Sequence, residues 1–181
     1  MTTAPALSTW TIDPVHSVPE FAVKHMVIST VKGRFTGVEG TITFDEAAPE
    51  RSSVVASIAV ASIDTGEPQR DAHLRSPDFF DVERYPTITF RSTRVERIDD
   101  ERYRVTGDLT IRDVTRPVTL DVEYEGQIKD AYGKQRAALT ATTQIDRRDF
   151  GLNWNAVLEA GGFVVSNAVK ITLHIAAVRD E

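Results

Sequence analysis

The stretch SIDTGEPQRDAHLRSPDFFDVERYPTITF, residues Ser62–Phe90, decides how this chain is organised. Glycine and proline residues break a strand-like pattern here, and Glu67–Arg75 has the polar composition of one short helix. Ser76 and Pro77 suit the start of a second helical turn, because serine caps a helix and proline needs no amide donor there. The stretch therefore predicts a compact helical excursion between strands.

Phe79 and Phe80 follow this second turn at once, and Tyr85-Pro86 then forces an extended backbone. A polar turn that leads into two aromatic side chains is what a lid over an apolar cavity would contain. Plain core packing of the two rings produces the same pattern. Both interpretations of Phe79 and Phe80 stay open at this point.

On both sides of the excursion, apolar and polar residues alternate with the two-residue period of a half-buried strand. The predicted strands are Glu20–Ile28, Phe35–Asp45, Ser53–Ser62, Thr87–Val95, Tyr103–Arg112, Pro117–Ile128, Gln135–Ile145 and Val164–Val178. Short connections separate them, with Gly33 as the predicted first turn, and such connections favour antiparallel hairpins. About eight strands with one polar face each form either two stacked sheets or a closed barrel.

Composition restricts the class of protein. At 181 residues the chain fits one domain over residues 10–181, after a disordered N-terminal tail over residues 1–9. A net charge of −6 without any basic run argues against a nucleic-acid partner. The sequence contains no apolar segment long enough for a membrane span and no secretory signal in its first residues, so we expect a cytoplasmic protein.

The sequence contains no recognisable metal-ligand or nucleophile motif. Cysteine is absent, and no histidine pair has HxH or HxxxH spacing, so separate polar or core histidines are favoured over a metal site. There is no GxSxG elbow, and Ser17 beside His16 is adjacency only. Asp149-Phe150-Gly151 is interpreted as a turn after a strand. We therefore expect neither a metal ion nor a cofactor.

Arg70, Asp71, His73 and Arg75 form the densest polar cluster in the chain. The favoured interpretation is a solvated helix face on which Asp71 pairs with Arg75 four residues later. The alternative is a site for the head group of a ligand. Lone His174 alternates with apolar neighbours and is predicted to face solvent.

Several segments together resemble the YceI-like family of polyisoprenoid-binding proteins. They are HSVPEFAVKH (His16–His25), GRF (Gly33–Phe35), SIDTGEPQRDAHLRSPDFFDVERYPTITFRST (Ser62–Thr93), GDLTIRDVTRPVTL (Gly107–Leu120) and RRDFG (Arg147–Gly151). The resemblance spans Trp10 to Val178, and its RDxHLxSxDFF element is long and distinctive. The chain departs from the family pattern at Arg112-Asp113, where a glycine is usual.

The resemblance implies a lipocalin-like, extended antiparallel β-barrel with a helical loop, a long isoprenoid lipid of the polyprenyl or quinone type inside, and no catalysis. Strand parity then supplies candidate lipid-binding residues. These are Phe21, Val23, His25, Ile42, Phe44, Ile58, Phe90, Leu109, Leu120, Leu139, Ile171 and Leu173, with Phe79 and Phe80 at the mouth. Burial is worth ~0.8 kcal/mol per methylene against an association cost of roughly 4 to 15 kcal/mol, so a long tail is needed.

Two other functions stay open. An enzyme acting on a small amphiphile would use His25, His73, Asp71 and Arg70, and it requires at least two of them to meet inside a pocket. An interaction module would instead present an exposed strand edge or the Phe79-Phe80 pair, and it could form a homodimer.

Overall fold

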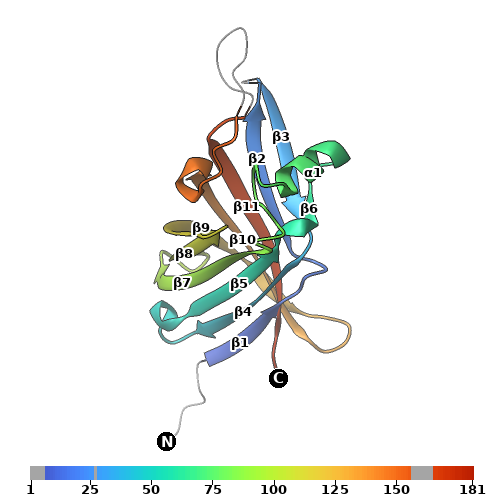
Figure 1. The fold of residues 1–181 in the computed structure, drawn as a ribbon. Helices are drawn as coiled ribbons and strands as arrows, with labels where there is room; N and C mark the ends of the chain where they lie inside the picture. The colour runs from blue at the N-terminus through green and yellow to red at the C-terminus, as the bar shows by residue number, and fades with distance from the viewer. Residues whose placement is uncertain (1–6, 27, 156–164) are drawn as a thin grey trace, which may run out of the picture.

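The structure, a computed structural model, describes residues 7–26, 28–155 and 165–181 (Figure 1). Its strands are β1 (Leu7–Ile12), β2 (Val18–His25), β3 (Ser29–Phe35), β4 (Val38–Asp45), β5 (Ser53–Ala59), β6 (Ile63–Asp64), β7 (Thr87–Arg97), β8 (Arg102–Ile111), β9 (Val114–Lys129), β10 (Gln135–Asp146) and β11 (Ala168–Arg179). Its helices are α1 (Pro68–Arg75) and the short 3-10 turns η1 (Pro49–Arg51), η2 (Val60–Ser62) and η3 (Arg147–Phe150). Residues 1–6 of the predicted tail lie outside the described residues, and β1 begins at Leu7, before the predicted start at Trp10.

Eight of the strands close into an antiparallel barrel in the order β1-β4-β5-β7-β8-β9-β10-β11, because β11 also pairs with β1. A closed ring pairs the backbone groups that an open sheet leaves at its edges. The alternation of side chains along each strand then points one set inward and the other to solvent. The predicted all-β antiparallel barrel with a short helical excursion is confirmed, and two stacked sheets are excluded.

Three further strands, β2, β3 and β6, extend one end of the barrel beyond this ring (Figure 1). β11 holds both parts together, since it pairs with β1 through Ala177–Arg179 and with β2 through Lys170–His174. Among the described residues no pairing joins β6 to β7, and α1 lies beside β6. The helical excursion therefore stands where the strand wall is incomplete.

Where the three further strands meet the barrel, the interruptions of neighbouring strands lie side by side. The predicted strand Ser53–Ser62 stops at Ala59 and turns through η2 before β6. There the Ser62 hydroxyl accepts hydrogen bonds from the backbone amides of Thr36 and Gly37, at 3.2 and 3.0 Å, between β3 and β4. One side chain thus satisfies the backbone donors at the neighbouring break.

The predicted turn at Gly33 is wrong. Gly33 lies within β3 opposite Phe21 of β2, and a Cβ atom there would come 2.3 Å from Cζ of the Phe21 ring. The glycine is required for this close approach of ring and backbone. The β2–β3 connection instead lies between His25 and Ser29, and Met26 there adopts a left-handed φ of 52°.

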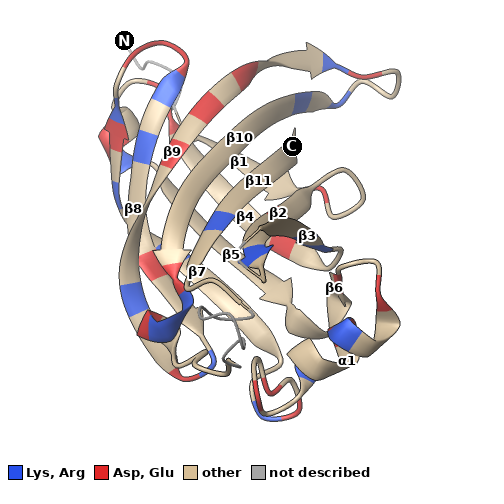
Figure 2. Cartoon of the chain, turned by 90° about the horizontal axis from the view of Figure 1, so that it is seen from above, with Lys and Arg blue, Asp and Glu red and all other residues tan. Residues whose placement is uncertain are grey.

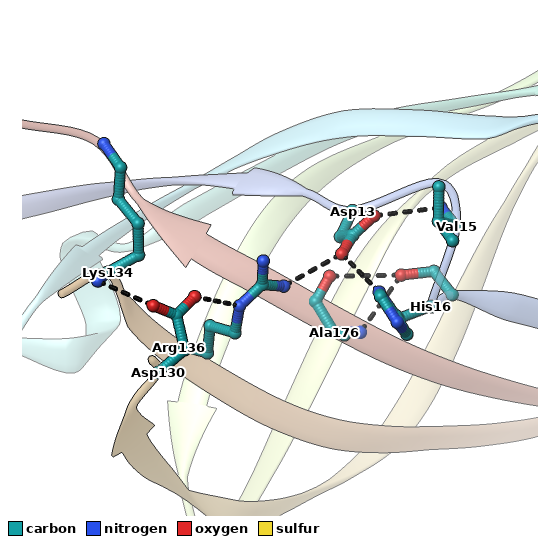
Figure 3. Close-up of polar contacts among 8 residues, drawn as sticks. Asp13, Val15, His16, Asp130, Lys134, Arg136 and Ala176 are labelled. Atoms are coloured by element: carbon teal, nitrogen blue, oxygen red, sulfur yellow. Dashed lines mark hydrogen bonds and ion pairs between the residues drawn. The ribbon is translucent and has the colours of Figure 1, made fainter. Parts of the chain in front are cut away.

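Between β1 and β2, a cluster of polar residues forms hydrogen bonds with the backbone of β11 (Figure 3). The amide of Asp13 donates to the carbonyl of Ala176 at 2.8 Å, and buried Ser17 both donates to that carbonyl and accepts from the Ala176 amide. Arg136 joins the Asp13 carboxylate, at 2.9 Å, to Asp130, at 2.6 Å. The cluster lies where β11 stops pairing with β2 and begins to pair with β1.

Asp13 gives this cluster a dependence on pH. Burial opposes ionisation, but hydrogen bonds from His16 and Arg136 outweigh it and lower the pKa of Asp13 from 3.8 to about 2. A folded-state pKa below the unfolded value stabilises the fold above pH 3.8, and this contribution is lost as the pH falls toward 2.

We expect Asp13→Asn to lower the free energy of unfolding by about 1 to 2 kcal/mol near pH 6. The difference from the unmodified protein should shrink as the pH falls toward 2, because the Asp13 carboxylate then becomes increasingly protonated. Urea denaturation at several pH values measures it. Asp121→Asn is the control, since that exposed carboxylate pairs with Arg104 only at 3.7 Å. A difference that stays constant with pH would contradict the role of Asp13.

Candidate functional site

The barrel encloses a cavity of about 960 Å³, and inward side chains from the barrel strands and from β2 and β3 line it. Its wall is mostly aliphatic and aromatic, because inward positions of the strands carry Val, Ile, Leu and Phe. The lining includes every predicted candidate, namely Phe21, Val23, His25, Ile42, Phe44, Ile58, Phe79, Phe80, Phe90, Leu109, Leu120, Leu139, Ile171 and Leu173. Their contact with a ligand stays a prediction.

A buried aromatic cluster holds the helical excursion against the wall. The Phe79 ring is only 6% exposed and lies 5.3 Å from the Trp154 ring, centroid to centroid. Phe80 meets Phe35 edge to face at 6.1 Å. The predicted core packing of the two rings is present, because Phe79 belongs to the core and Phe80 packs against it; both also line the cavity, and a role as a lid stays a prediction. They form no exposed patch for a partner protein.

The rim beside α1 carries polar groups. His73 lies edge-on to Trp154 at 4.6 Å, and its Nε2 is hydrogen-bonded to the Asp78 carboxylate at 2.7 Å. Arg70 donates through Nε to the Thr65 hydroxyl at 2.7 Å and through Nη2 to the Thr65 carbonyl at 2.8 Å. Arg70 and His73 both line the cavity, so a ligand inside it can reach polar groups at this end.

The predicted pairing of Asp71 with Arg75 is wrong, and Asp71 does not face solvent, whereas His73 and Arg75 are partly exposed. Asp71 is buried and accepts hydrogen bonds from the amide and hydroxyl of Thr65, the first at 2.9 Å. Arg75 donates to the backbone carbonyls of Ala61, at 3.1 Å, and Ile63, at 3.0 Å. These contacts tie α1 to the preceding strand, so both side chains are scaffold.

The proposed catalytic set does not assemble. Of its members, His25, His73 and Arg70 line the cavity, whereas Asp71 does not. In the part of the chain that the structure describes, no hydrogen bond joins any two of these four. The same part contains no group of three acidic, histidine or cysteine side chains able to hold a metal ion. His174 is half-exposed beside Glu20, as predicted.

Sequence reasoning missed Arg147, the buried cation beside the cavity. Its side chain is 4% exposed and donates to the carbonyls of Leu152, at 2.6 Å, Trp154, at 2.8 Å, Val165, at 3.4 Å, and Ser166, at 2.9 Å. Burial lowers the pKa of this guanidinium. The residue fastens two segments of the chain to each other at the end of β10. Arg147 belongs to the RRDFG segment that the sequence singles out, but the sequence alone does not distinguish it from exposed Arg148.

Away from α1, the cavity reaches the part of the barrel built by β1, β4 and β8. Tyr103 meets Phe44 edge to face at 6.2 Å, and burial raises the pKa of its phenol. Trp10 is buried on β1 and donates through Nε1 to the Ser8 hydroxyl at 2.8 Å. Aromatic rings and aliphatic side chains together line the cavity. No helix among the described residues has the length and apolar character to cross a membrane.

Comparisons with known proteins show which proteins this chain is similar to. A family model described as YceI-like domain matches residues 10–177. A UPF0312 protein of Photorhabdus laumondii is 42% identical over 135 residues, covering 75% of this chain and 70% of that protein. The crystal structure of Burkholderia cenocepacia BcnA is similar with a TM-score of 0.80 at 25% identity, covering 91% of this chain and 98% of that one. A polyisoprenoid binding domain from Saccharophagus degradans, implicated in plant cell wall breakdown, shares the fold, with a TM-score of 0.66 at 16% identity over 98% of this chain and 100% of that one.

Proposed function

Because the chain belongs to the YceI-like family, we propose that it binds a long-chain isoprenoid lipid inside the barrel and stores or carries it without chemical change. The observation that carries the proposal is the apolar cavity of about 960 Å³. That volume lies near the upper end of the ~300 to 1,000 Å³ typical of ligand sites. The polyisoprenoid binding domain of Saccharophagus degradans, which has the same fold, supports this class of ligand.

The chemistry of the wall favours a polyprenyl or quinone-type chain over a compact polar molecule. An isoprenoid tail offers no hydrogen-bonding groups, and most of the wall needs none, because apolar side chains such as Leu109, Leu120 and Ile171 line it. Each buried methylene contributes ~0.8 kcal/mol, so affinity should rise with chain length until the cavity is filled. The polar rim at Arg70 and His73 is the proposed position of the head group.

Native extraction tests the proposal. Protein purified without detergent should release an isoprenoid lipid, near one molecule per chain, on organic extraction and mass spectrometry. Farnesol, geranylgeraniol and solanesol should then bind the emptied protein with affinity that increases with chain length. Recovery of no lipid, together with no retention of added solanesol, would refute the proposed function.

A further inference from the structure

The hairpin that joins β2 to β3 ends in exposed apolar side chains. Met26 is 50% exposed and Ile28 is 84% exposed, although both are large and hydrophobic. Single exposed apolar residues are ordinary, but two at one protruding tip form a surface that suits an apolar partner. Figure 1 shows this hairpin projecting from the end of the molecule on which α1 lies.

The apolar tip continues directly from the wall of the cavity. Val23, His25 and Val31 line the cavity, and Val23 pairs with Val31 while His25 pairs with Ser29 at the end of the hairpin. His25, the last residue of β2, lines the cavity, and the next residue, Met26, is exposed. A molecule that leaves the cavity at this end therefore passes the tip.

The charge of the hairpin differs from that of the rest of the chain. From Val18 to Phe35 the hairpin contains three basic residues, Lys24, Lys32 and Arg34, and one acidic residue, Glu20, whereas the chain as a whole carries a net charge of −6. Both lysines are exposed. On the barrel strands β7, β8 and β9, by contrast, the two signs lie together (Figure 2), with Arg104 of β8 between Glu96 of β7 and Asp121 of β9.

We propose that this hairpin tip, defined by Lys24, Met26, Ile28 and Lys32, docks on an anionic lipid membrane. Met26 and Ile28 enter the boundary between head groups and acyl chains, and the lysines lie against the anionic head groups. The contact brings the end of the cavity lined by Val23, His25 and Val31 to the bilayer, so a lipid that leaves at this end does not cross water. This inference rests on the proposed function, because a membrane is where an insoluble isoprenoid is found.

Co-sedimentation with vesicles tests the docking. The unmodified protein should bind vesicles of phosphatidylcholine and phosphatidylglycerol, and it should bind phosphatidylcholine vesicles at least severalfold more weakly. Met26→Ser with Ile28→Ser should reduce the binding constant at least tenfold. Ile128→Ser with Tyr132→Ser is the matched control, because these exposed side chains lie on the β9–β10 hairpin, away from the proposed tip. This control should bind like the unmodified protein.

The electrostatic part has its own variants. Lys32→Glu should weaken binding to the anionic vesicles severalfold and reduce its dependence on salt, whereas Lys129→Glu on the other hairpin should not. Thermal unfolding verifies that each variant folds, which the exposure of the substituted residues favours. Absence of vesicle binding by the unmodified protein, or equal losses in tip and control variants, would overturn the docking.

The two proposals fail in distinguishable ways. A protein that carries extracted lipid but does not bind vesicles refutes the docking and leaves the proposed function standing. A protein that binds vesicles through the tip but neither releases an isoprenoid on extraction nor retains added solanesol refutes the proposed function. Capture of a partner protein by the tip, without affinity for vesicles, would also overturn the docking.

Discussion

Replacing Ala56 with tryptophan is expected to lower lipid occupancy at least tenfold. Ala56 lies on β5, lines the cavity, and pairs with Gly40 on one side and Phe90 on the other. Gly40 has no side chain, so an indole at position 56 has room to turn inward and occupy the space of the ligand. Overpacking of a filled core costs roughly 1 to 3 kcal/mol, and the open cavity should reduce that cost. Extraction and mass spectrometry of equal amounts of protein measure the occupancy.

Val55→Trp is the matched control for Ala56→Trp. Val55 is the preceding residue on the same strand, is 42% exposed and points to the opposite face, so its replacement should leave lipid occupancy unchanged. Both variants carry the same new side chain, which removes any general effect of tryptophan. Full occupancy in Ala56→Trp, with thermal stability preserved, would mean that the lipid does not lie against β5.

Replacing Arg147 with alanine is expected to lower the free energy of unfolding by at least about 3 kcal/mol, because hydrogen bonds to a charged group contribute about 1.5 to 3 kcal/mol each. The substitution removes the hydrogen-bond donors of four backbone carbonyls, including those of Leu152 and Trp154. A buried polar group without its partner bears its whole desolvation cost. Urea denaturation gives the change in stability.

Arg148→Ala isolates the effect of position from that of residue type. Arg148 is exposed and pairs with the neighbouring Asp146, so its loss should cost less than about 1 kcal/mol. Arg147→Lys should recover only part of the stability, because an ammonium has three donors in place of the planar fork of the guanidinium. Equal effects at the two positions would show that the carbonyl contacts of Arg147 contribute little.

The strand pattern predicted the barrel and its wall because both depend on local alternation. Each strand of two-residue period has one apolar face, and inward positions such as Leu109 and Leu120 follow from parity once the ring is closed. The family resemblance supplied the closure itself. Parity alone left stacked sheets and a barrel equally possible, since both bury the same faces.

The features that sequence reasoning missed all depend on contacts between different structural elements. The sequence alone suggests a turn at Gly33, whereas the structure places the Phe21 ring against it. Asp71 and Arg75 have the right spacing for a helical ion pair, yet Thr65 and two backbone carbonyls of the preceding segment bind them more closely. Sequence spacing predicts contacts within one helix, and here both side chains bind partners outside the helix.

Barrel closure joins segments at opposite ends of the sequence: the hydroxyl of Thr11 on β1 donates to Asp180, just beyond β11, across 169 positions. Chains dominated by such distant pairings fold slowly, in roughly milliseconds to seconds, because the entropy of loop closure must be overcome first. During synthesis the ring cannot close until β11 has left the ribosome. Until then the apolar inner faces and the unpaired edges of β1 and β10 are exposed to other chains. Rapid expression should therefore favour aggregation over assembly, and slower synthesis should raise the soluble yield.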